Sequence, residues 1–381
     1  MSKSRSSQSN PKYILNPTTG QIIAEQKRHT EEDLTAAVAR AREVQAGWQA
    51  RGLGYRSGII RAASPIIAER AKQLTDTICT CSGKPRVDAL GTELLTAALV
   101  CRYYPRLARR TLRPKRIRRS SILFFNKHSR LVREPYGVVG IIGPWNYPLG
   151  IPMHELVQAL LAGNTVVFKV ATQSQPVGDA HRAGAKVWIC KGEYPTSERI
   201  EDKPPYIHPP VVIENADESM LVHKREIFGP VLAVKKVKNV EEALRWANDS
   251  RLGLCASIWT TDRRTARKLS ARLQTGVVMI NDHLMSHGMP ETPWGGYKQS
   301  SIGRCHGELG FLEVTQAKVI VDDLLHRSPR NFWWLPYDEH LEEGILGGID
   351  ALFARALGRR LRGFLRLMQS YLGSLRRQAR D

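Results

Sequence analysis

The feature that most constrains the fold is a strand–helix–strand pattern between residues 137 and 169. An apolar, β-branched run at Gly137–Ile142 leads into a loop, and a helical segment at Ile151–Ala162 ends before Gly163, a common C-cap residue. Thr165–Lys169 has the composition of a second strand. Two strands joined by a helix within roughly 30 residues pair in parallel through a right-handed crossover. The sequence therefore predicts an α/β fold.

Helical spacing dominates the residues before this unit. Apolar residues recur every three or four positions in Thr30–Trp48, where Thr30 and Asp33 predict an N-terminal capping pair. The same spacing continues from Tyr55 to Arg110, with an interruption at Ser82–Pro85. We therefore expect a helical region ahead of the parallel strands.

A hairpin is predicted between the helical region and this unit. Ile122–Asn126 and Arg130–Arg133 have strand composition, and Lys127–Ser129 would form the turn, although its turn signal is weak. Beyond residue 179 strands and helices alternate again, which is typical of α/β architecture. Strands are expected at Val231–Val237, Leu254–Trp259, Gly276–Ile280 and Val314–Asp322, and helices at Val240–Asn248 and Asp262–Gln274.

The chain is strongly basic, and much of the excess charge lies in two regions. Lys and Arg total 57 against 36 Asp and Glu among 381 residues, which gives a net charge of +21. Residues 102–119 hold nine basic side chains and no acidic one. Between 349 and 380 apolar residues and arginines recur at helical spacing, which predicts an amphipathic basic helix or helix pair. Such a helix fits either an anionic membrane surface or packing on its own protein with a solvated arginine face.

Composition excludes several classes of protein. No stretch reaches the roughly 18 apolar residues of a membrane-spanning helix, and the polar residues 1–11 predict no secretory signal. Aromatic residues do not interleave with the basic runs, so no specific nucleic-acid partner is expected. The cysteines lack zinc-like spacing, which predicts reduced thiols, no metal site and a cytoplasmic protein, with peripheral membrane association as an option; they are Cys79, Cys81, Cys101, Cys190, Cys255 and Cys305.

Five segments in sequence order resemble the NAD(P)-dependent aldehyde dehydrogenase superfamily. They are REPYGVVGIIGPWNYP (133–148), ALLAGNTVVFKVA (159–171), KREIFGPVLAV (224–234), GLCASIWTTD (253–262) and PETPWGGYKQSSIGRCHGELGFLEVTQAKVI (290–320). The resemblance implies an incomplete Rossmann-type parallel sheet domain and an α/β catalytic-domain remnant, with intersubunit β elements and an added C-terminal amphipathic helical tail. It also implies NAD or NADP as cofactor, an aldehyde substrate and a homo-oligomer.

The resemblance implies roles for five residues. In the family's reaction a Cys thiolate attacks the aldehyde, hydride passes to the nicotinamide, and a carboxylate activates water to hydrolyse the thioester. Asn146 matches the side-chain donor to the oxyanion. The cofactor residues are Lys169 on the adenosine ribose, Glu226 and Phe228 on the nicotinamide ribose, and Trp145 in the nicotinamide or substrate channel.

Each of these residues also has an ordinary structural interpretation. Asn146 could satisfy the backbone of its own loop, and Lys169 could be a solvated strand end. Glu226 could form a surface salt bridge, while Phe228 and Trp145 could simply pack. The geometry of the folded chain has to separate these alternatives.

The sequence departs from the family where the chemistry is concentrated. Thr172 stands where the family usually carries a Glu that shares the ribose contact with Lys169. The segment 169–178 runs directly into 179–188, which resembles family sequence from beyond the nucleophile. A deletion at Gly178–Asp179 would remove the pyrophosphate-binding helix N-terminus, the general-base Glu and the nucleophilic Cys.

Two residues could imitate the lost groups, and neither has the required motif. Cys190 has no thiolate-stabilising surroundings in sequence, and Glu308 in GELG matches a later, structural helix. We therefore expect a family member with little or no activity, in which cofactor binding could also be lost. The alternatives are a non-catalytic oligomerising or membrane-surface protein, and an internally deleted or misassembled reading frame.

The junction also defines the expected domains. We expect a disordered tail (1–12), a helical, hairpin and truncated cofactor region (13–178), a catalytic remnant (179–305), an oligomerisation strand (306–325) and a basic amphipathic extension (326–381).

Overall fold

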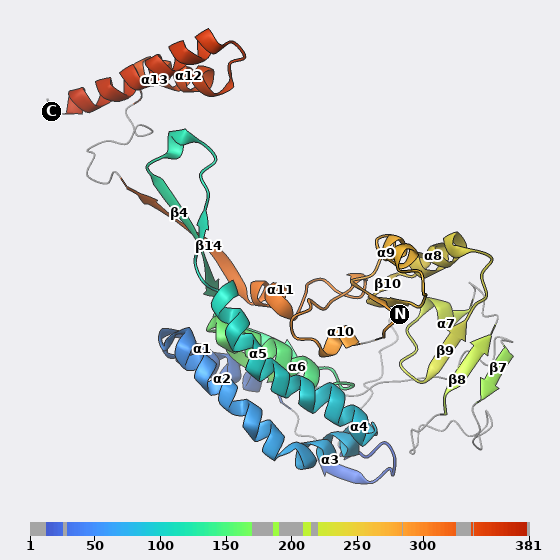
Figure 1. The fold of residues 1–381 in the computed structure, drawn as a ribbon. Coiled ribbons are helices and arrows are strands. Elements are labelled where there is room, and N and C mark those ends of the chain that lie inside the picture. Colours follow the sequence, from blue (N-terminus) through green and yellow to red (C-terminus); the bar gives the residue numbers. More distant parts are fainter. Residues whose placement is uncertain are drawn as a thin grey trace, which may run out of the picture. The chain divides into compact units, whose positions relative to one another are not determined.

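The computed structural model describes residues 13–25, 29–169, 186–189, 209–214, 220–283, 285–324, 337 and 339–378. The chain divides into two units: the first comprises residues 1–113 and 133–316, and the second comprises residues 114–132 and 317–381. Figure 1 draws both, coloured from blue at the N-terminus to red at the C-terminus. The tail 1–12, Thr172, the junction at 178–179 and Cys190 lie outside the described residues. The domain division based on that junction therefore stays a prediction.

The first unit begins with a small hairpin and a capped helix. Strands β1 (Tyr13–Leu15) and β2 (Ile22–Glu25) pair in antiparallel fashion ahead of α1 (Glu31–Ala50). α1 has the predicted capping box: the Thr30 side chain accepts from the Asp33 amide, and the Asp33 carboxylate accepts from the Thr30 amide. These bonds satisfy backbone donors at the start of the helix.

The helical stretch after α1 is divided into several helices. They are α2 (Gly52–Glu69), α3 (Ala71–Ser82), α4 (Arg86–Asp88), the π-helical turn η1 (Ala89–Leu95) and α5 (Thr96–Thr111). The predicted interruption is confirmed, because α3 ends at Gly83 with a φ of +72°. Glycine adopts this left-handed conformation without the cost that a Cβ imposes.

The strand–helix–strand unit has the predicted topology. β5 (Val138–Ile142) and β6 (Thr165–Lys169) are parallel neighbours, and α6 (Gly150–Ala162) connects them. Asn164 is fully buried and stabilises the connection between α6 and β6. Its Oδ1 accepts from the amide immediately before β5 at 2.9 Å, and its Nδ2 donates to the Val314 carbonyl at 2.9 Å.

The main core of the first unit lies between helices. α6 packs on α2 and α5, and α11 (Gly307–Glu313) contacts both α5 and α6 (Figure 1). Tyr104, Leu161 and Phe311 are fully buried at this junction. Burial of apolar surface is the dominant favourable term in folding, so this core fixes α6 and the loop at its N-terminus.

The rest of the first unit alternates strands and helices, as predicted. β7 (Lys186–Ile189), β8 (Val211–Glu214) and β9 (Val231–Val234) form one sheet in that order, with β8 and β9 parallel. β11 (Cys255–Ile258) and β12 (Val277–Ile280) form another parallel pair. The other elements are α7 (Leu221–Lys224), α8 (Val240–Asp249), α9 (Arg263–Ser270), α10 (Met285–Gly288), and the paired strands β10 (Leu252–Gly253) and β13 (Tyr297–Lys298).

The predicted hairpin is wrong in its strands. Ile122–Phe124 forms a short 3-10 helix, and the segment expected to turn belongs to the continuous strand β4 (Lys127–Pro135). β4 lies between β3 (Lys115–Ile117) and β14 (Thr315–Asp323) in one sheet. The first residue of β4 forms an ion pair at 2.6 Å with the last residue of β14. Pairing with β3 on one side and with the distant strand β14 on the other therefore holds the expected turn segment in extended conformation.

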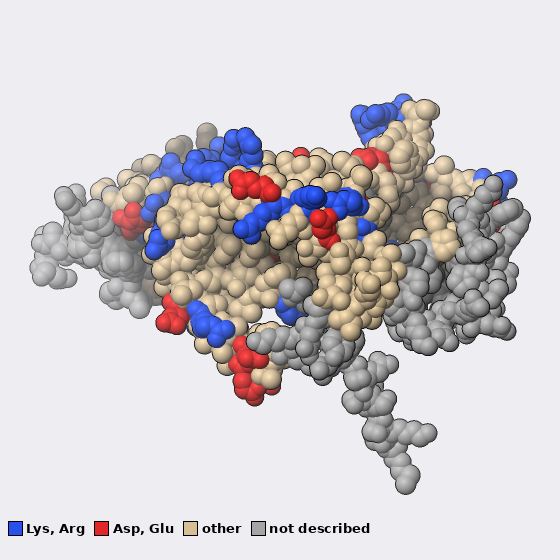
Figure 2. Space-filling view, turned by 90° about the horizontal axis from the view of Figure 1, so that it is seen from below, with Lys and Arg blue, Asp and Glu red and all other residues tan. Residues whose placement is uncertain are grey.

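The predicted C-terminal helical region is a pair of helices, drawn red in Figure 1. α12 (Glu339–Phe353) and α13 (Leu357–Gln378) belong to the second unit and pack along each other. No helix among the described residues combines the length and the hydropathy needed to cross a lipid bilayer. Figure 2 shows groups of Lys and Arg side chains on one face of the molecule, with Asp and Glu between them.

Candidate functional site

Three of the five predicted site residues lie at one edge of the β5–β6 pair. The loop Pro144–Pro148 follows β5, and its residues Trp145 and Asn146 are half-buried. Lys169 ends β6 opposite the last residue of β5, and its carbonyl accepts from the Gly143 amide at 2.9 Å. Open parallel sheets bind ligands at the carboxyl ends of their strands. The Lys169 side chain is exposed at that end.

The other two predicted residues lie on the loop between α7 and β9. The ring of Phe228 lies 5.2 Å from that of Trp145, centroid to centroid, with 55° between their planes. This is within the range of favourable aromatic pairs. Phe228 remains 50% exposed, so it is not a core residue. Glu226, two residues earlier, is exposed on the same loop.

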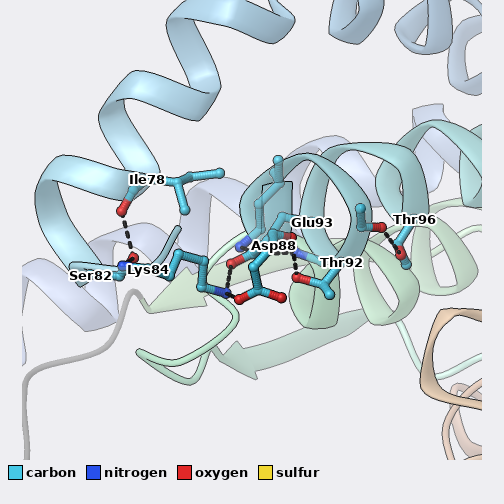
Figure 3. Close-up of polar contacts among 10 residues, drawn as sticks. Ile78, Ser82, Lys84, Asp88, Thr92, Glu93 and Thr96 are labelled. Atoms are coloured by element: carbon cyan, nitrogen blue, oxygen red, sulfur yellow. Dashed lines mark hydrogen bonds and ion pairs between the residues drawn. The ribbon is translucent and has the colours of Figure 1, made fainter. Parts of the chain in front are cut away.

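A buried carboxylate holds the Asn146 loop at its far end. Glu93 in η1 is fully buried, and its Oε2 accepts from the amides of Leu149 and Gly150 at 2.9 and 2.8 Å. Its Oε1 accepts from the Lys84 ammonium at 2.8 Å (Figure 3). The two amides lie at the start of α6, where the helix has free donors and partial positive charge. Glu93 thereby fixes where the loop enters α6.

Lys84 contacts both the Glu93 carboxylate and the ring of Tyr147 in the Asn146 loop. Its ammonium lies 3.7 Å from the Asp88 carboxylate (Figure 3) and 4.1 Å from the centroid of the Tyr147 ring. Burial, together with the charges of Asp88 and Glu93, raises the pKa of Tyr147. The phenol therefore stays neutral, and the residue after Asn146 is held by a cation–π contact.

Three buried histidines lie behind the same loop. The rings of His154 and His306 stack with their centroids 3.5 Å apart, and His287 lies 6.3 and 5.6 Å from them. The Tyr104 hydroxyl is 2.6 Å from His154 Nδ1, and Tyr147 contacts His287 at a centroid distance of 5.2 Å. We call His154, His287 and His306 the histidine cluster.

The environment of the histidine cluster favours neutral rings. Burial, together with the neighbouring imidazoles, lowers the pKa of His154 to about 2 and that of His306 to about 3. Burial also lowers the pKa of His287. Stacked rings do not direct their nitrogens at a common point, and among the described residues no group of His, Cys, Asp and Glu side chains is arranged to hold a metal ion.

Four cysteines of the described chain are unsuited to act as nucleophiles. Burial raises the pKa of Cys81 and Cys255, and it raises that of Cys101 to about 11 and that of Cys305 to about 12. A reactive cysteine needs a depressed pKa, because the thiolate is the attacking species. These thiols therefore stay protonated.

Sequence reasoning placed Glu308 correctly in a helix and missed Glu93 and the histidine cluster. Glu308 lies in the first turn of α11, as its motif predicts. Glu93 was detectable only as a carboxylate inside the apolar run ALGTELL. The histidines come from three distant segments, so no local spacing relates them.

Related sequences align with most of the chain. The model described as "Aldehyde dehydrogenase family" matches residues 4–180 and 174–320. A 4,4'-diapolycopene aldehyde oxidase of Methylomonas sp is 25% identical over 441 aligned residues, which cover 77% of this chain and 83% of the relative. A putative succinate-semialdehyde dehydrogenase [NADP(+)] of Mycolicibacterium smegmatis is 24% identical, with coverages of 76% and 84%.

Solved structures show the same fold at low identity. The crystal structure of betaine aldehyde dehydrogenase from Staphylococcus aureus, in complex with NAD+, superposes with a TM-score of 0.74 and 20% identity. The match covers 88% of this chain and 96% of that one. An NADP-dependent glyceraldehyde-3-phosphate dehydrogenase from Bacillus halodurans, complexed with NADP, has a TM-score of 0.72.

Proposed function

Because the chain belongs to the aldehyde dehydrogenase family, we propose that it retains part of that family's cofactor and aldehyde site but oxidises aldehydes weakly or not at all. The observation that carries the retained site is the contact between Trp145 and Phe228 at 5.2 Å. These rings come from the two separate segments that resemble the family's cofactor-binding motifs. Asn146 and Lys169 lie at the same strand edge as Trp145.

The proposed cofactor is NAD or NADP, held by Trp145, Lys169, Glu226 and Phe228. An exposed aromatic ring on the same loop as Glu226, together with an exposed lysine at the strand end, suits a ligand with a planar ring and ribose hydroxyls. When bound, this cofactor would accept a hydride from the substrate carbon. The amide of Asn146 would donate a hydrogen bond to the carbonyl oxygen as negative charge develops on it.

The proposed loss of activity rests on the chain around residue 178. The two family matches meet at residues 174–180, and the aligned length with the Methylomonas relative exceeds the length of this chain. Both findings support an internal deletion at Gly178–Asp179, which would remove the nucleophile, the base and the pyrophosphate helix. Oxyanion donors without a nucleophile leave only modest catalysis.

Cofactor binding and turnover can be measured separately. Titration with NADH and NADPH should quench tryptophan fluorescence saturably, and the Trp145→Ala/Phe228→Ala variant should lose saturation. Trp259→Phe, at an exposed position outside the site, is the matched control. Succinate semialdehyde and a long-chain apolar aldehyde should give no reduction of NAD+ or NADP+ above the rate of Asn146→Ala. Turnover that falls about 100-fold or more in Asn146→Ala would contradict the proposed inactivity.

A second candidate is a non-catalytic protein that oligomerises or binds a membrane surface. The exposed Val319 and Val321 on β14 favour association of copies through that strand, and the exposed apolar residues of α13 favour a lipid surface. A cytoplasmic location with peripheral membrane contact belongs to this proposal. Sequencing the locus across codons 178 and 179 distinguishes this candidate from a misassembled reading frame. If the reading frame is misassembled, the intact frame of the locus contains the missing segment.

A further inference from the structure

We propose that the turn end of the α12–α13 pair docks on an anionic phospholipid bilayer. This deepens the membrane-surface candidate above and rests on it, while cofactor binding by the first unit is independent of it. The proposal depends on three properties of the pair: its rigidity, its uncovered apolar face and its charge. We call residues 349–366, which include the turn between the helices, the hairpin tip.

The two helices are joined by hydrogen bonds, and glycines let their backbones approach closely. The Ser370 hydroxyl donates to the His340 carbonyl at 2.5 Å, and Arg360 Nε donates to the Ala351 carbonyl at 3.1 Å, which makes the helices antiparallel. A Cβ on Gly347 would lie 2.6 Å from the Gly363 carbonyl oxygen. Such close backbone approach gives a rigid pair with little freedom to bury its outer faces against itself.

α13 exposes a continuous apolar stripe. With 3.6 residues per turn, its six members fall within roughly 100° of the helix circumference. Their exposed fractions run from 39% to 72%, so α12 does not cover them. The stripe consists of Leu357, Leu361, Phe364, Leu365, Met368 and Leu372.

α12 has an exposed apolar stripe of its own. Ile345, Leu346, Ile349 and Phe353 are exposed and also share one arc of the helix. In each helix the centre of the stripe lies roughly 150° around the helix axis from the buried glycine face, in the same direction of rotation. In two antiparallel helices that face each other, both stripes therefore point outward, away from the partner helix, and both are inclined toward the same side of the pair.

The charge of the hairpin tip selects an anionic surface. It contains five arginines and one acidic residue, Asp350, which pairs with Arg359 at 2.8 Å. The carboxylates of Glu339, Glu342 and Glu343 lie at the opposite end of the pair. An apolar stripe bordered by arginines is the pattern of helices that lie in the interface of anionic bilayers. A second copy on this face would bring two arginine clusters together, which is unfavourable.

Flotation of the full chain with vesicles tests the proposal. Binding is expected to vesicles that contain phosphatidylserine and to be weaker with phosphatidylcholine alone. Leu361→Glu/Phe364→Glu should reduce the partition coefficient at least about tenfold. Arg355→Gln/Arg362→Gln should reduce it about tenfold at low salt and less at high salt. Leu34→Glu, an equally exposed leucine on α1, should leave it unchanged.

Several results would overturn the proposal. They are no flotation with either vesicle, flotation undiminished by Leu361→Glu/Phe364→Glu, and binding to a DNA duplex in place of vesicles. A dimer that the same variant disperses would assign the face to a second copy. A lower melting temperature of that variant without lipid would show that the chain itself covers the face. NADH titration of the same preparations tests the proposed cofactor site separately.

Discussion

Glu93 illustrates how one buried charge can organise a loop that lies far from it in sequence. Its two oxygens are shared between Lys84 and the first amides of α6. Loss of the charge would leave an almost buried ammonium without its nearest partner, which is the costly way to break a buried pair. The carboxylate is therefore a positioning group for the Asn146 loop.

Glu93→Gln is expected to lower the free energy of unfolding by about 2–4 kcal/mol. The amide oxygen can still accept from the backbone, but Lys84 loses its nearest charged partner and the added NH2 group is buried. Urea denaturation followed by circular dichroism measures this. Glu69→Gln, at an exposed position on α2, should change the stability by less than about 0.5 kcal/mol. Equal effects of the two substitutions would contradict the positioning role of Glu93.

The histidine cluster predicts acid sensitivity. His154 and His306 have folded pKa values near 2 and 3, against 6.5 for a free imidazole. Between about pH 6.5 and 3 the unfolded chain therefore binds more protons than the folded chain, so the free energy of unfolding falls as the pH falls through this window. Each imidazole contributes about 1.4 kcal/mol per pH unit there, and nothing above it.

His154→Gln should make the acid-induced loss of stability less steep. Glutamine can still accept a hydrogen bond from the Tyr104 hydroxyl but takes up no proton. Urea unfolding at a series of pH values from 7 to 4 should show a shallower decline than the unmodified chain. His29→Gln, at an exposed position with the same charge change, should leave the slope unaltered. A decline of equal steepness in His154→Gln would assign the acid sensitivity to other groups.

At the scale of elements, prediction from sequence succeeds where the signal is local. The capping pair of α1, the C-cap of α6 and the parallel pairing of β5 with β6 all follow from neighbouring residues. The hairpin prediction failed because β3 has three exposed residues and no alternating pattern, and because β4 also pairs with β14, which lies far along the chain. The histidine cluster was missed for the same reason, since only the tertiary fold brings His154, His287 and His306 together.

The helix pair of the second unit predicts opposite effects of two glycine substitutions. In Gly347→Ala the new methyl group would meet the Gly363 carbonyl, so the pair should lose about 1–3 kcal/mol. Gly358 on α13 has open space around it, and Gly358→Ala should gain up to about 1 kcal/mol from helix propensity. Amide hydrogen exchange in α12 and α13 reads out both effects. Destabilisation of similar size by both substitutions would contradict the close packing at Gly347.

At the scale of the whole molecule, the two units have separate sources of stability. The first unit is built on the core around Tyr104, Leu161 and Phe311. The helices of the second unit are joined by glycine contacts and by few buried apolar side chains, since most of their large apolar residues are exposed. Regions with few buried contacts open at lower free energy than the main core. We therefore expect the second unit to open without unfolding of the first.

Hydrogen exchange of the full chain, with one variant for each unit, tests this independence. Glu93→Gln should speed exchange in α5 and α6 and leave α12 and α13 unchanged, because its lost contacts all lie in the first unit. Gly347→Ala should speed exchange in α12 and α13 and leave α5 and α6 unchanged. When the two units open independently, a substitution that destabilises one unit does not change hydrogen-exchange protection in the other. Faster exchange in both units from either single substitution would mean that they unfold together.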